Sequence, residues 1–137
     1  MNVLVIDAHG GGVGKALVTE IKKVLPDVIV TAVGTNSVAT TAMKKAGADF
    51  AATGENSVVV CTRNADIIVG PIGIVIADSL LGEITSRMAE AVGQASAKRI
   101  LIPMKNCGNI VAGVGNFNMT HLISEAVKEI ENICKDK

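Results

Sequence analysis

Residues 2–18 read NVLVIDAHGGGVGKALV, and this stretch decides the fold. Asn2 to Ile6 form a short apolar run typical of a buried strand, and apolar side chains from about Gly14 to Leu25 recur with a helical period. A glycine-rich turn joins the two, and Pro26 ends the helix. A strand, a glycine turn and a helix in this order are typical of the first unit of a parallel α/β sheet.

The same alternation continues along the chain. We expect further strands at 28–33, 48–51, 66–69, 99–103 and 109–114, and further helices at 37–46, 55–63, 85–95 and 119–134. Segment 72–81 carries one charged residue in ten and is expected to form a turn and a helix buried against the sheet or a partner. The predicted fold is one Rossmann-like α/β domain over residues 1–137, a three-layer sandwich whose mostly parallel sheet has about five to six strands.

Composition limits the classes of partner. The 13 basic and 13 acidic residues balance, and two Phe with no Trp or Tyr provide no stacking platform, so we expect no nucleic-acid or membrane binding. No run approaches the roughly 18 apolar residues that span a bilayer. The first strand begins without a charged leader, and three widely spaced cysteines fit reduced thiols, so a cytoplasmic location is expected.

Apolar residues make up 49% of the chain, and the mean hydropathy is +0.45. This is more apolar surface than a small monomer readily buries, so a homodimer or a higher homo-oligomer is expected. The candidate interface is Ile72–Leu81 together with the helix that follows.

The glycine turn is the strongest functional signal. Glycines let a backbone approach a ligand closely, and a helix N-terminus offers unpaired N–H groups and a partial positive charge to an anion. A nucleotide or dinucleotide phosphate is therefore expected on the turn, with walls from the loops after the second and fourth strands. The predicted site residues are Asp7, His9, Gly10, Gly11, Gly12, Gly14, Lys15, Gly34, Thr35, Asn36, Gly70, Pro71 and Gly73.

Two phosphate-binding motifs match this turn incompletely. The dinucleotide pattern GxGxxG fails because Lys15 stands where the third glycine is required. The NTPase phosphate loop fails because Ala16 replaces the Ser or Thr that holds magnesium. A magnesium–triphosphate site is therefore disfavoured.

The local sequence resembles the short-chain dehydrogenase/reductase family, in which the first strand leads into a loop ending GIGKAL. The residues in register are Gly12, Gly14, Lys15, Ala16 and Leu17, with Ala8 at that family's first glycine. Residues 66–73, DIIVGPIG, are similar to that family's fourth strand, DILVNNAG. The resemblance implies that the glycine turn and the loop after the fourth strand flank one crevice of a sheet ordered 3-2-1-4-5.

The resemblance does not extend to catalysis. That family uses a Tyr-x-x-x-Lys pair, and this chain has no tyrosine. Its second strand ends in Gly34, Thr35 and Asn36 rather than in an acidic residue for a ribose. NAD(P) or another nucleotide is therefore the expected cofactor class, with its identity open.

Over nearly its whole length the chain also resembles a family of short bacterial proteins known only as a domain of unknown function. The segments that carry this likeness are GGGVGKALV, GTNSVATTAMKKAGAD, ATGENSVVV, ADIIVGPIGIVIADSLLGEIT and ILIP. The likeness implies a Rossmann-like unit and no particular activity.

Other residues have two readings each. Asp7 can contact a ligand or cap the N–H groups of its own turn, and His9 is an acid or base by its ordinary pKa or a solvated side chain without a partner. Residues 53–56 read as a turn and helix start or as part of an adenine site. Asp78 and Glu83 are charged residues in an apolar stretch. They are interpreted either as buried carboxylates with a raised pKa, or as groups that face a partner or lie exposed at a helix end. Cys107 is a nucleophile or an idle thiol.

No metal site is expected, because His9 and His121 lack ligand spacing. The function favoured by the sequence is a binding or sensing protein for a nucleotide. The alternatives are a small reductase, transferase or hydrolase using Asp7, His9 or Asp78, and a structural homo-oligomeric subunit without a ligand.

Overall fold

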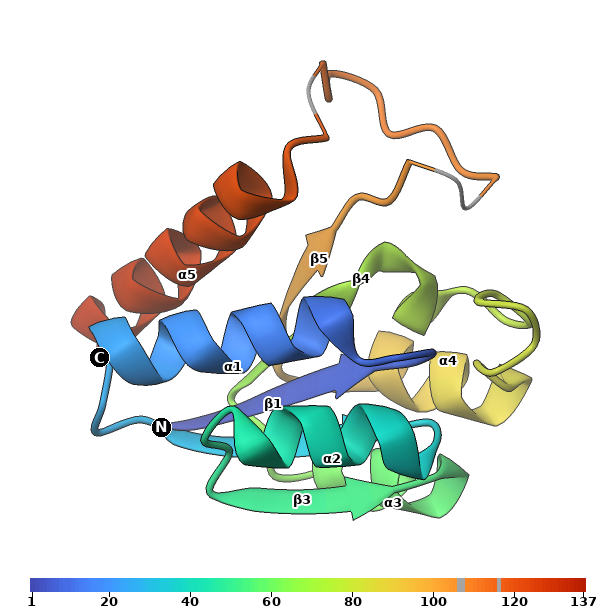
Figure 1. The fold of residues 1–137 in the computed structure, drawn as a ribbon, viewed down its shortest axis with the longest axis horizontal. Helices are drawn as coiled ribbons and strands as arrows, with labels where there is room; N and C mark the ends of the chain where they lie inside the picture. Colours follow the sequence, from blue (N-terminus) through green and yellow to red (C-terminus); the bar gives the residue numbers. More distant parts are fainter. Residues whose placement is uncertain (106–107, 116) are drawn as a thin grey trace.

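The computed structural model describes residues 1–105, 108–115 and 117–137. Within these ranges five strands and five α-helices alternate, with one short 3-10 helix (Figure 1). In order these are β1 (Asn2–Asp7), α1 (Gly12–Val24), β2 (Ile29–Gly34), α2 (Ser37–Lys45), β3 (Phe50–Thr53), α3 (Glu55–Thr62), β4 (Ile67–Pro71), η1 (Ile72–Val75), α4 (Ser86–Gln94), β5 (Lys98–Ile102) and α5 (Met119–Lys135).

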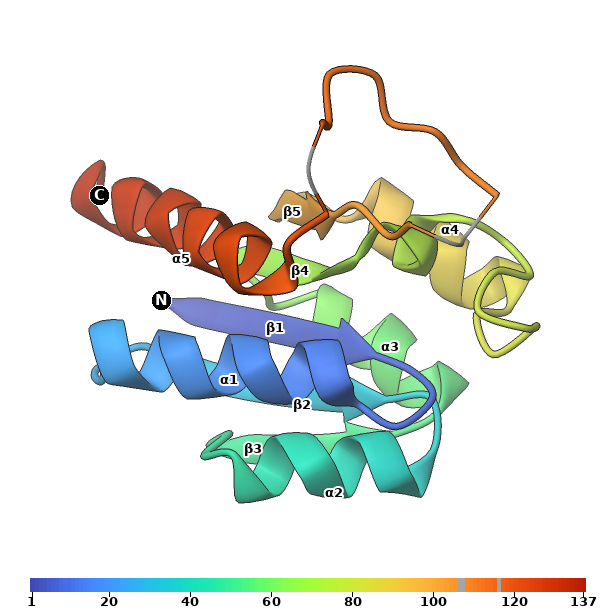
Figure 2. The same cartoon turned by 45° about the horizontal axis from the view of Figure 1, so that its top comes forward.

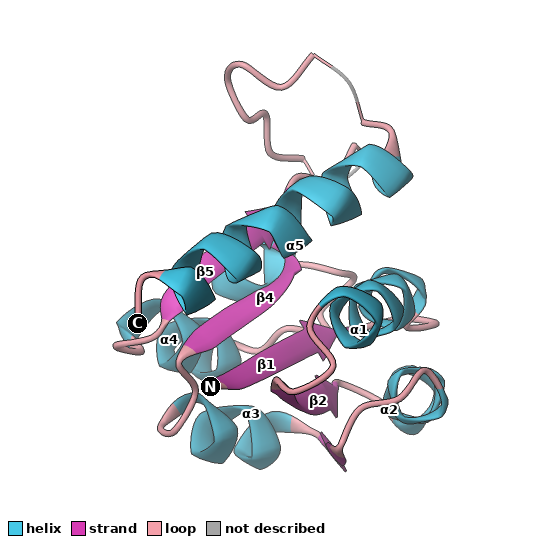
Figure 3. Ribbon diagram, turned by 90° about the vertical axis from the view of Figure 1, so that its left-hand side faces the viewer, coloured by secondary structure: helices cyan, strands magenta, loops and turns pink. Residues whose placement is uncertain are grey.

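The five strands form one parallel sheet in the order β3-β2-β1-β4-β5. The central strand β1 is buried on both faces because helices cover both sides. Val3 and Val5 pack with α1, α2 and α5, whereas Leu4 and Ile6 pack with α3, α4 and η1. Figures 2 and 3 show these two helical layers on either side of the sheet. The predicted three-layer α/β fold is confirmed.

Polar side chains fix the starts of three helices. Asn36, Thr85 and Asn118 accept hydrogen bonds from backbone N–H groups in the first turns of α2, α4 and α5. Such N-caps satisfy donors that have no partner within the helix. At α1 the N-cap is Gly11, which has no side chain, and the first-turn N–H of Gly14 is accepted by Asp7 instead.

The predicted sixth strand at 109–114 is wrong, because the sheet ends at β5 and this segment contains only turn and irregular structure. Gly113 has a φ of 89°, and the side chain of Ile110 is 99% exposed. An apolar pattern alone does not make a segment pair with a sheet edge, although β5 is an edge strand.

Segment 72–81 also differs from its prediction. It begins with the short η1 helix and continues in turns. Asp78, Leu80 and Leu81 have positive φ values of 65°, 56° and 58°, which a right-handed helix does not contain. Only the first half of the segment is buried against the sheet, and Leu81 is 95% exposed.

Candidate functional site

The carboxyl ends of the parallel strands meet at one edge of the sheet. In the strand order 3-2-1-4-5, the chain moves from β1 towards one side of the sheet and from β4 towards the other, so the order reverses between β1 and β4. Ligands of such sheets bind in the crevice at this switch point. The glycine turn after β1, the loop 76–84 and the segment after β5 all reach this edge (Figure 1).

Two glycines of the turn are required by packing. Gly11 has a φ of 75°, and a Cβ there would lie 2.8 Å from Ala39 Cα of α2. At Gly14 a Cβ would lie 2.5 Å from Met43 Sδ and 2.9 Å from Asp7 Cβ. These glycines allow α1 and α2 to approach the turn, so their presence does not itself indicate a ligand.

Gly10 and Gly12 differ, because a Cβ at either position would meet nothing within 4 Å. Neither has a positive φ. The N–H groups of Gly12 and Val13, in the first turn of α1, have no hydrogen-bond acceptor among the residues described. Lys15 is exposed beside them, and no ion pair involving it occurs in the described part of the chain. The turn therefore presents two open glycines, two unpaired donors and a cation.

Asp7 supports the turn from below. Its side chain lies on the α1 face of the sheet and is 5% exposed. One carboxylate oxygen accepts the Ala8 N–H at 2.8 Å, and the other accepts the Gly14 N–H at 2.6 Å. Burial raises the pKa of Asp7, opposed by the hydrogen bonds from Gly14 and Ala8. This geometry supports the capping interpretation of Asp7.

Glu83 joins three loops at this edge. Its Oε1 atom accepts hydrogen bonds from the His9 N–H at 3.0 Å, the Thr35 hydroxyl at 2.6 Å and the Asn36 amide at 2.8 Å. Asn36 also donates to the His9 carbonyl at 2.9 Å. The loops after β1 and β2 and the loop 76–84 are thereby tied to a single carboxylate.

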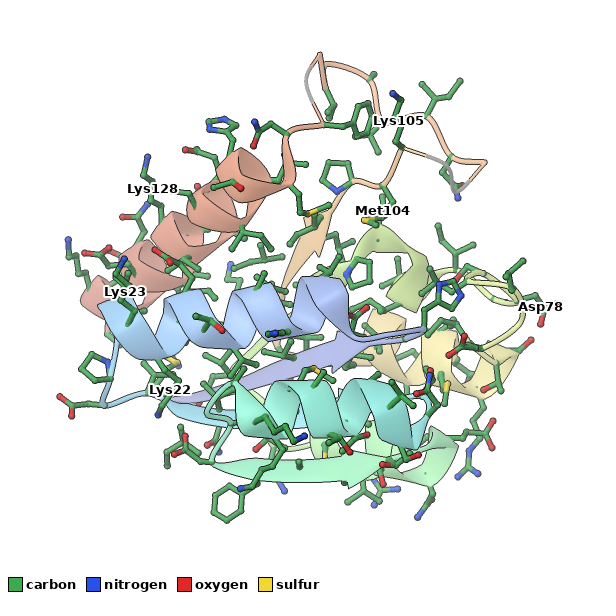
Figure 4. All side chains as sticks on the ribbon, in the orientation of Figure 1. Lys22, Lys23, Asp78, Met104, Lys105 and Lys128 are labelled. Carbon is green, nitrogen blue, oxygen red and sulfur yellow. The ribbon has the colours of Figure 1, made fainter. Side chains whose placement is uncertain are left out.

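Of the two interpretations of Glu83, the buried carboxylate with a raised pKa is wrong. Burial raises the pKa, but the hydrogen bonds from Thr35, His9 and Asn36 outweigh it, and the pKa lies below its usual value. Asp78 is exposed, which agrees with the exposed interpretation of this residue and not with the buried one. Figure 4 shows Asp78 at the outer end of its loop.

His9 has partners, contrary to the solvated reading. Its Nε2 atom lies 3.0 Å from the Leu80 carbonyl and 3.2 Å from Glu83 Oε2. Its φ of 53° is unusual for a residue other than glycine. The ring therefore holds loop 76–84 against the glycine turn.

The residues predicted to form the walls of the site lie at and after the carboxyl ends of β2 and β4. A Cβ at Gly34 would approach Thr40 N to 2.5 Å, one at Gly70 would collide with the Ile6 carbonyl, and one at Gly73 would lie 2.9 Å from Ser79 Oγ. Pro71 ends β4 and is buried. Thr35 and Asn36 face Glu83, as described above. These glycines are explained by packing, and the ligand roles of the wall residues remain a prediction.

Two hollows flank the glycine turn. The first, of about 620 Å³, is lined by His9, Asp78, Ser79, Leu80, Leu81, Pro103, Met104, Lys105, Phe117 and Met119. The second, of about 500 Å³, is lined by Gly12, Lys15, Ala16, Thr19, Glu20, Met119, Thr120, Ile123 and Ser124. Met119 lines both. The contribution of Met104, Phe117 and Met119 was not predicted. The sequence does contain a signal, since Phe117 and Met119 flank Asn118, the N-cap of α5.

The remaining candidates lie elsewhere. Thr53 ends β3, and Glu55 accepts a hydrogen bond from the Thr85 hydroxyl at 2.7 Å, linking α3 to α4. His121 lies in the first turn of α5. Cys107 lies outside the described residues. Within the described ranges no three His, Cys, Asp or Glu side chains gather as metal ligands, and no helix is both long and apolar enough to cross a bilayer.

Comparison with known proteins places the sequence in a family. The chain belongs to the family described as a domain of unknown function (DUF3842), whose model matches residues 2–135. Among solved structures it is similar to a dodecameric FMN-dependent UbiX-like decarboxylase from Escherichia coli O157:H7. That similarity has 19% sequence identity, covers 96% of this chain and 76% of the other, and has a TM-score of 0.48. The search of curated proteins found no match.

Proposed function

We propose, with membership of this family of unknown function as the premise, that the chain binds a nucleotide or dinucleotide through a phosphate seated on residues 10–15. The single observation that carries the proposal is the contrast between the glycines of the turn. Gly11 and Gly14 are required by packing, whereas Gly10 and Gly12 border open space beside unpaired N–H groups. A glycine in the first turn of a helix costs stability relative to alanine, so a ligand that approaches this backbone accounts for Gly12.

The charges around the turn favour an anion there. Lys15 adds a positive charge, and the N-terminus of α1 adds the partial charge of the helix dipole. Asp7 is directed at the backbone under the turn, and its oxygens are occupied by Gly14 and Ala8. Glu83 would repel a phosphate on the Thr35 side, which leaves the Gly12 side as the anion position.

A role in binding or sensing fits better than an enzyme that acts alone. Asp7 and His9 are engaged within the fold, and Asp78 points outward. NAD(P) is one candidate ligand, and a mononucleotide is another. Ala16 in place of Ser or Thr argues against a magnesium–triphosphate complex.

The experiment is a thermal-shift panel of NAD, NADP, FAD, FMN, ATP, GTP and CoA. A ligand that binds only the folded state stabilises it by about 2.7 kcal/mol at a hundred times its dissociation constant. Gly12→Val should abolish the shift, because the new side chain fills the phosphate position without a clash in the fold. Gly93→Val is the matched control, since Gly93 is also helical and also borders open space.

Two results would contradict the proposal. Ligand binding that survives Gly12→Val would remove the turn as the site. A flat panel at millimolar concentrations would favour the structural-subunit alternative, for which the expected homo-oligomer is tested by light scattering. Leu81 is the exposed end of the predicted Ile72–Leu81 interface, and an oligomer that dissociates on Leu81→Asn would support that alternative.

A further inference from the structure

The 620 Å³ hollow beside the glycine turn is mainly apolar. Leu80 and Leu81 line it from the loop after β4, and Met104, Phe117 and Met119 line it from either side of the β5–α5 connection. Its volume lies within the range of small-molecule sites. Methionine side chains adapt to irregular shapes and make favourable contacts with aromatic rings. Figure 4 shows Met104 and Lys105 at the same end of the molecule as Asp78.

All four non-glycine residues with positive φ in the described structure line this hollow. They are His9, Asp78, Leu80 and Leu81. Such conformations are energetically costly and persist only where the surroundings impose them, and residues that adopt them cluster at ligand sites. Leu81 is 95% exposed, so burial in the present fold does not account for its conformation.

Specific contacts impose the loop conformation. Asp78 N donates to the Ile84 carbonyl at 2.7 Å, and Gly82 N donates to the Asp78 carbonyl at 3.2 Å. His9 and Glu83 hold the loop to the glycine turn, as described above. The wall of the hollow is therefore preorganised before any ligand arrives.

The position of Met119 relates this hollow to the phosphate position. Met119 lines both hollows, and Gly12 and Lys15 line the second. A ligand that extends past Met119 into both hollows would place an anionic group near Gly12 and Lys15 and its other end against the apolar side chains of the first hollow. The ionised Glu83 disfavours a second anion near the first hollow.

We propose that the 620 Å³ hollow holds the heteroaromatic ring of a mononucleotide-sized ligand whose phosphate occupies the glycine turn. This inference rests on the proposed function and adds the second half of the site. Leu81 covers the ring from the solvent side, and Met104 and Met119 contact it. The ligand is an amphiphile with a ring at one end and a phosphate at the other.

The test compares whole ligands with their halves by calorimetry. AMP and FMN carry both ring and phosphate, ribose 5-phosphate carries the phosphate alone, and adenosine and riboflavin carry the ring alone. The expected result is that AMP or FMN binds at least about ten-fold more tightly than ribose 5-phosphate, because a buried ring contributes apolar area.

Leu81→Asn is the informative variant. Asn tolerates positive φ, so the loop keeps its shape while the apolar contact is lost. We expect AMP or FMN affinity to fall about five-fold and ribose 5-phosphate affinity to stay within about two-fold. Ile110→Asn is the matched control, because Ile110 is equally exposed and lies outside both hollows.

The outcomes separate this inference from the proposed function. Equal affinity for ribose 5-phosphate and AMP or FMN, or equal losses for all phosphates on Leu81→Asn, would overturn the ring site while leaving the phosphate site. Adenosine or riboflavin binding that depends on Leu81, with no contribution from phosphate, would overturn the glycine-turn proposal and support the ring site. No binding by any probe would overturn both.

Discussion

At the amino edge of the sheet, carboxylates accept hydrogen bonds from backbone N–H groups where strands begin. At the carboxyl edge, the N–H groups of Gly12 and Val13 have no acceptor among the residues described. Asp49 accepts the Val30 N–H at 2.8 Å and the Lys22 ammonium at 2.9 Å, and Asp66 accepts the Asn2 N–H at 2.7 Å. Lys22 and Lys23 lie at the opposite end of the molecule from Asp78 and Met104 in Figure 4.

The pKa values of carboxyl groups are shifted at both edges. The pKa of Asp49 is lowered, first by the Val30 hydrogen bond and then by Lys22, and that of Asp66 is lowered by the Asn2 hydrogen bond. At the carboxyl edge burial raises the pKa of Asp7, whereas hydrogen bonds lower that of Glu83, and His9, Leu80 and Leu81 adopt costly backbone conformations. Side-chain hydrogen bonds hold both edges, at the carboxyl edge those of Asp7 and Glu83. The difference is that at the carboxyl edge the N–H groups of Gly12 and Val13 have no acceptor among the residues described.

The largest expected effect on stability is at Asp7, which accepts two backbone N–H groups of the glycine turn. Asp7→Ala leaves the buried N–H groups of Ala8 and Gly14 without acceptors, which should lower the free energy of unfolding by about 2–4 kcal/mol. Urea unfolding at pH 7 measures this. A loss below about 1 kcal/mol would mean that the turn does not depend on this carboxylate.

The next effect tests the amino edge. Lys22 donates to the Val28 carbonyl at 2.9 Å and to Asp49, so Lys22→Met should lower the free energy of unfolding by about 1–2 kcal/mol. Lys23→Met is the control, because Lys23 is exposed and forms no ion pair within the described part of the chain. It should change stability by less than about 0.5 kcal/mol. Equal effects would remove the contrast between the edges.

A change of opposite sign is expected at the carboxyl edge. Without ligand, Leu81→Asn should raise the free energy of unfolding by about 0.5–1 kcal/mol, because Asn adopts left-handed backbone conformations at lower cost than Leu. Chemical denaturation of the variant and of Ile110→Asn gives the comparison. A destabilised Leu81→Asn would show that Leu81 carries packing the present contacts do not reveal.

The smallest effect is a dependence on pH at Glu83. The pKa of Glu83 is lowered, so its ionised form stabilises the fold above the ordinary value of 4.5, and this contribution is lost as pH falls through the lower folded-state pKa. Glu83→Gln should cost less than about 1 kcal/mol at pH 7 and converge with the parent near pH 3. Parallel stability curves between pH 7 and pH 3 would contradict this role.

Much of the architecture follows from local patterns. Every strand and α-helix of the described residues has a predicted counterpart, because most elements bury a face of their own sequence. Strand β3, whose residues are exposed or half-buried, is the exception. The segment at 109–114 failed because a local pattern does not specify whether a segment pairs with an edge strand, here β5.

The site was predicted less completely. The glycine turn was located because its residues are contiguous, but the distinction between Gly11 and Gly12 depends on Ala39 of a different helix. Glu83 stood out as a charge in an apolar stretch, yet its partners are 74, 48 and 47 residues away along the chain. The positive φ values of Leu80 and Leu81 oppose the preference of leucine, so no propensity predicts them.

The three consecutive left-handed residues Leu80, Leu81 and Gly82 also bear on proteolysis. Leu81 is fully presented to solvent, but the Glu83 N–H closes the turn on the Leu80 carbonyl at 3.2 Å. A protease that prefers apolar residues needs an extended segment in its cleft, so cleavage after Leu81 requires the loop to open first. The rate of cutting at this bond therefore reports how often loop 76–84 opens, and a ligand that occupies the neighbouring hollow would slow it.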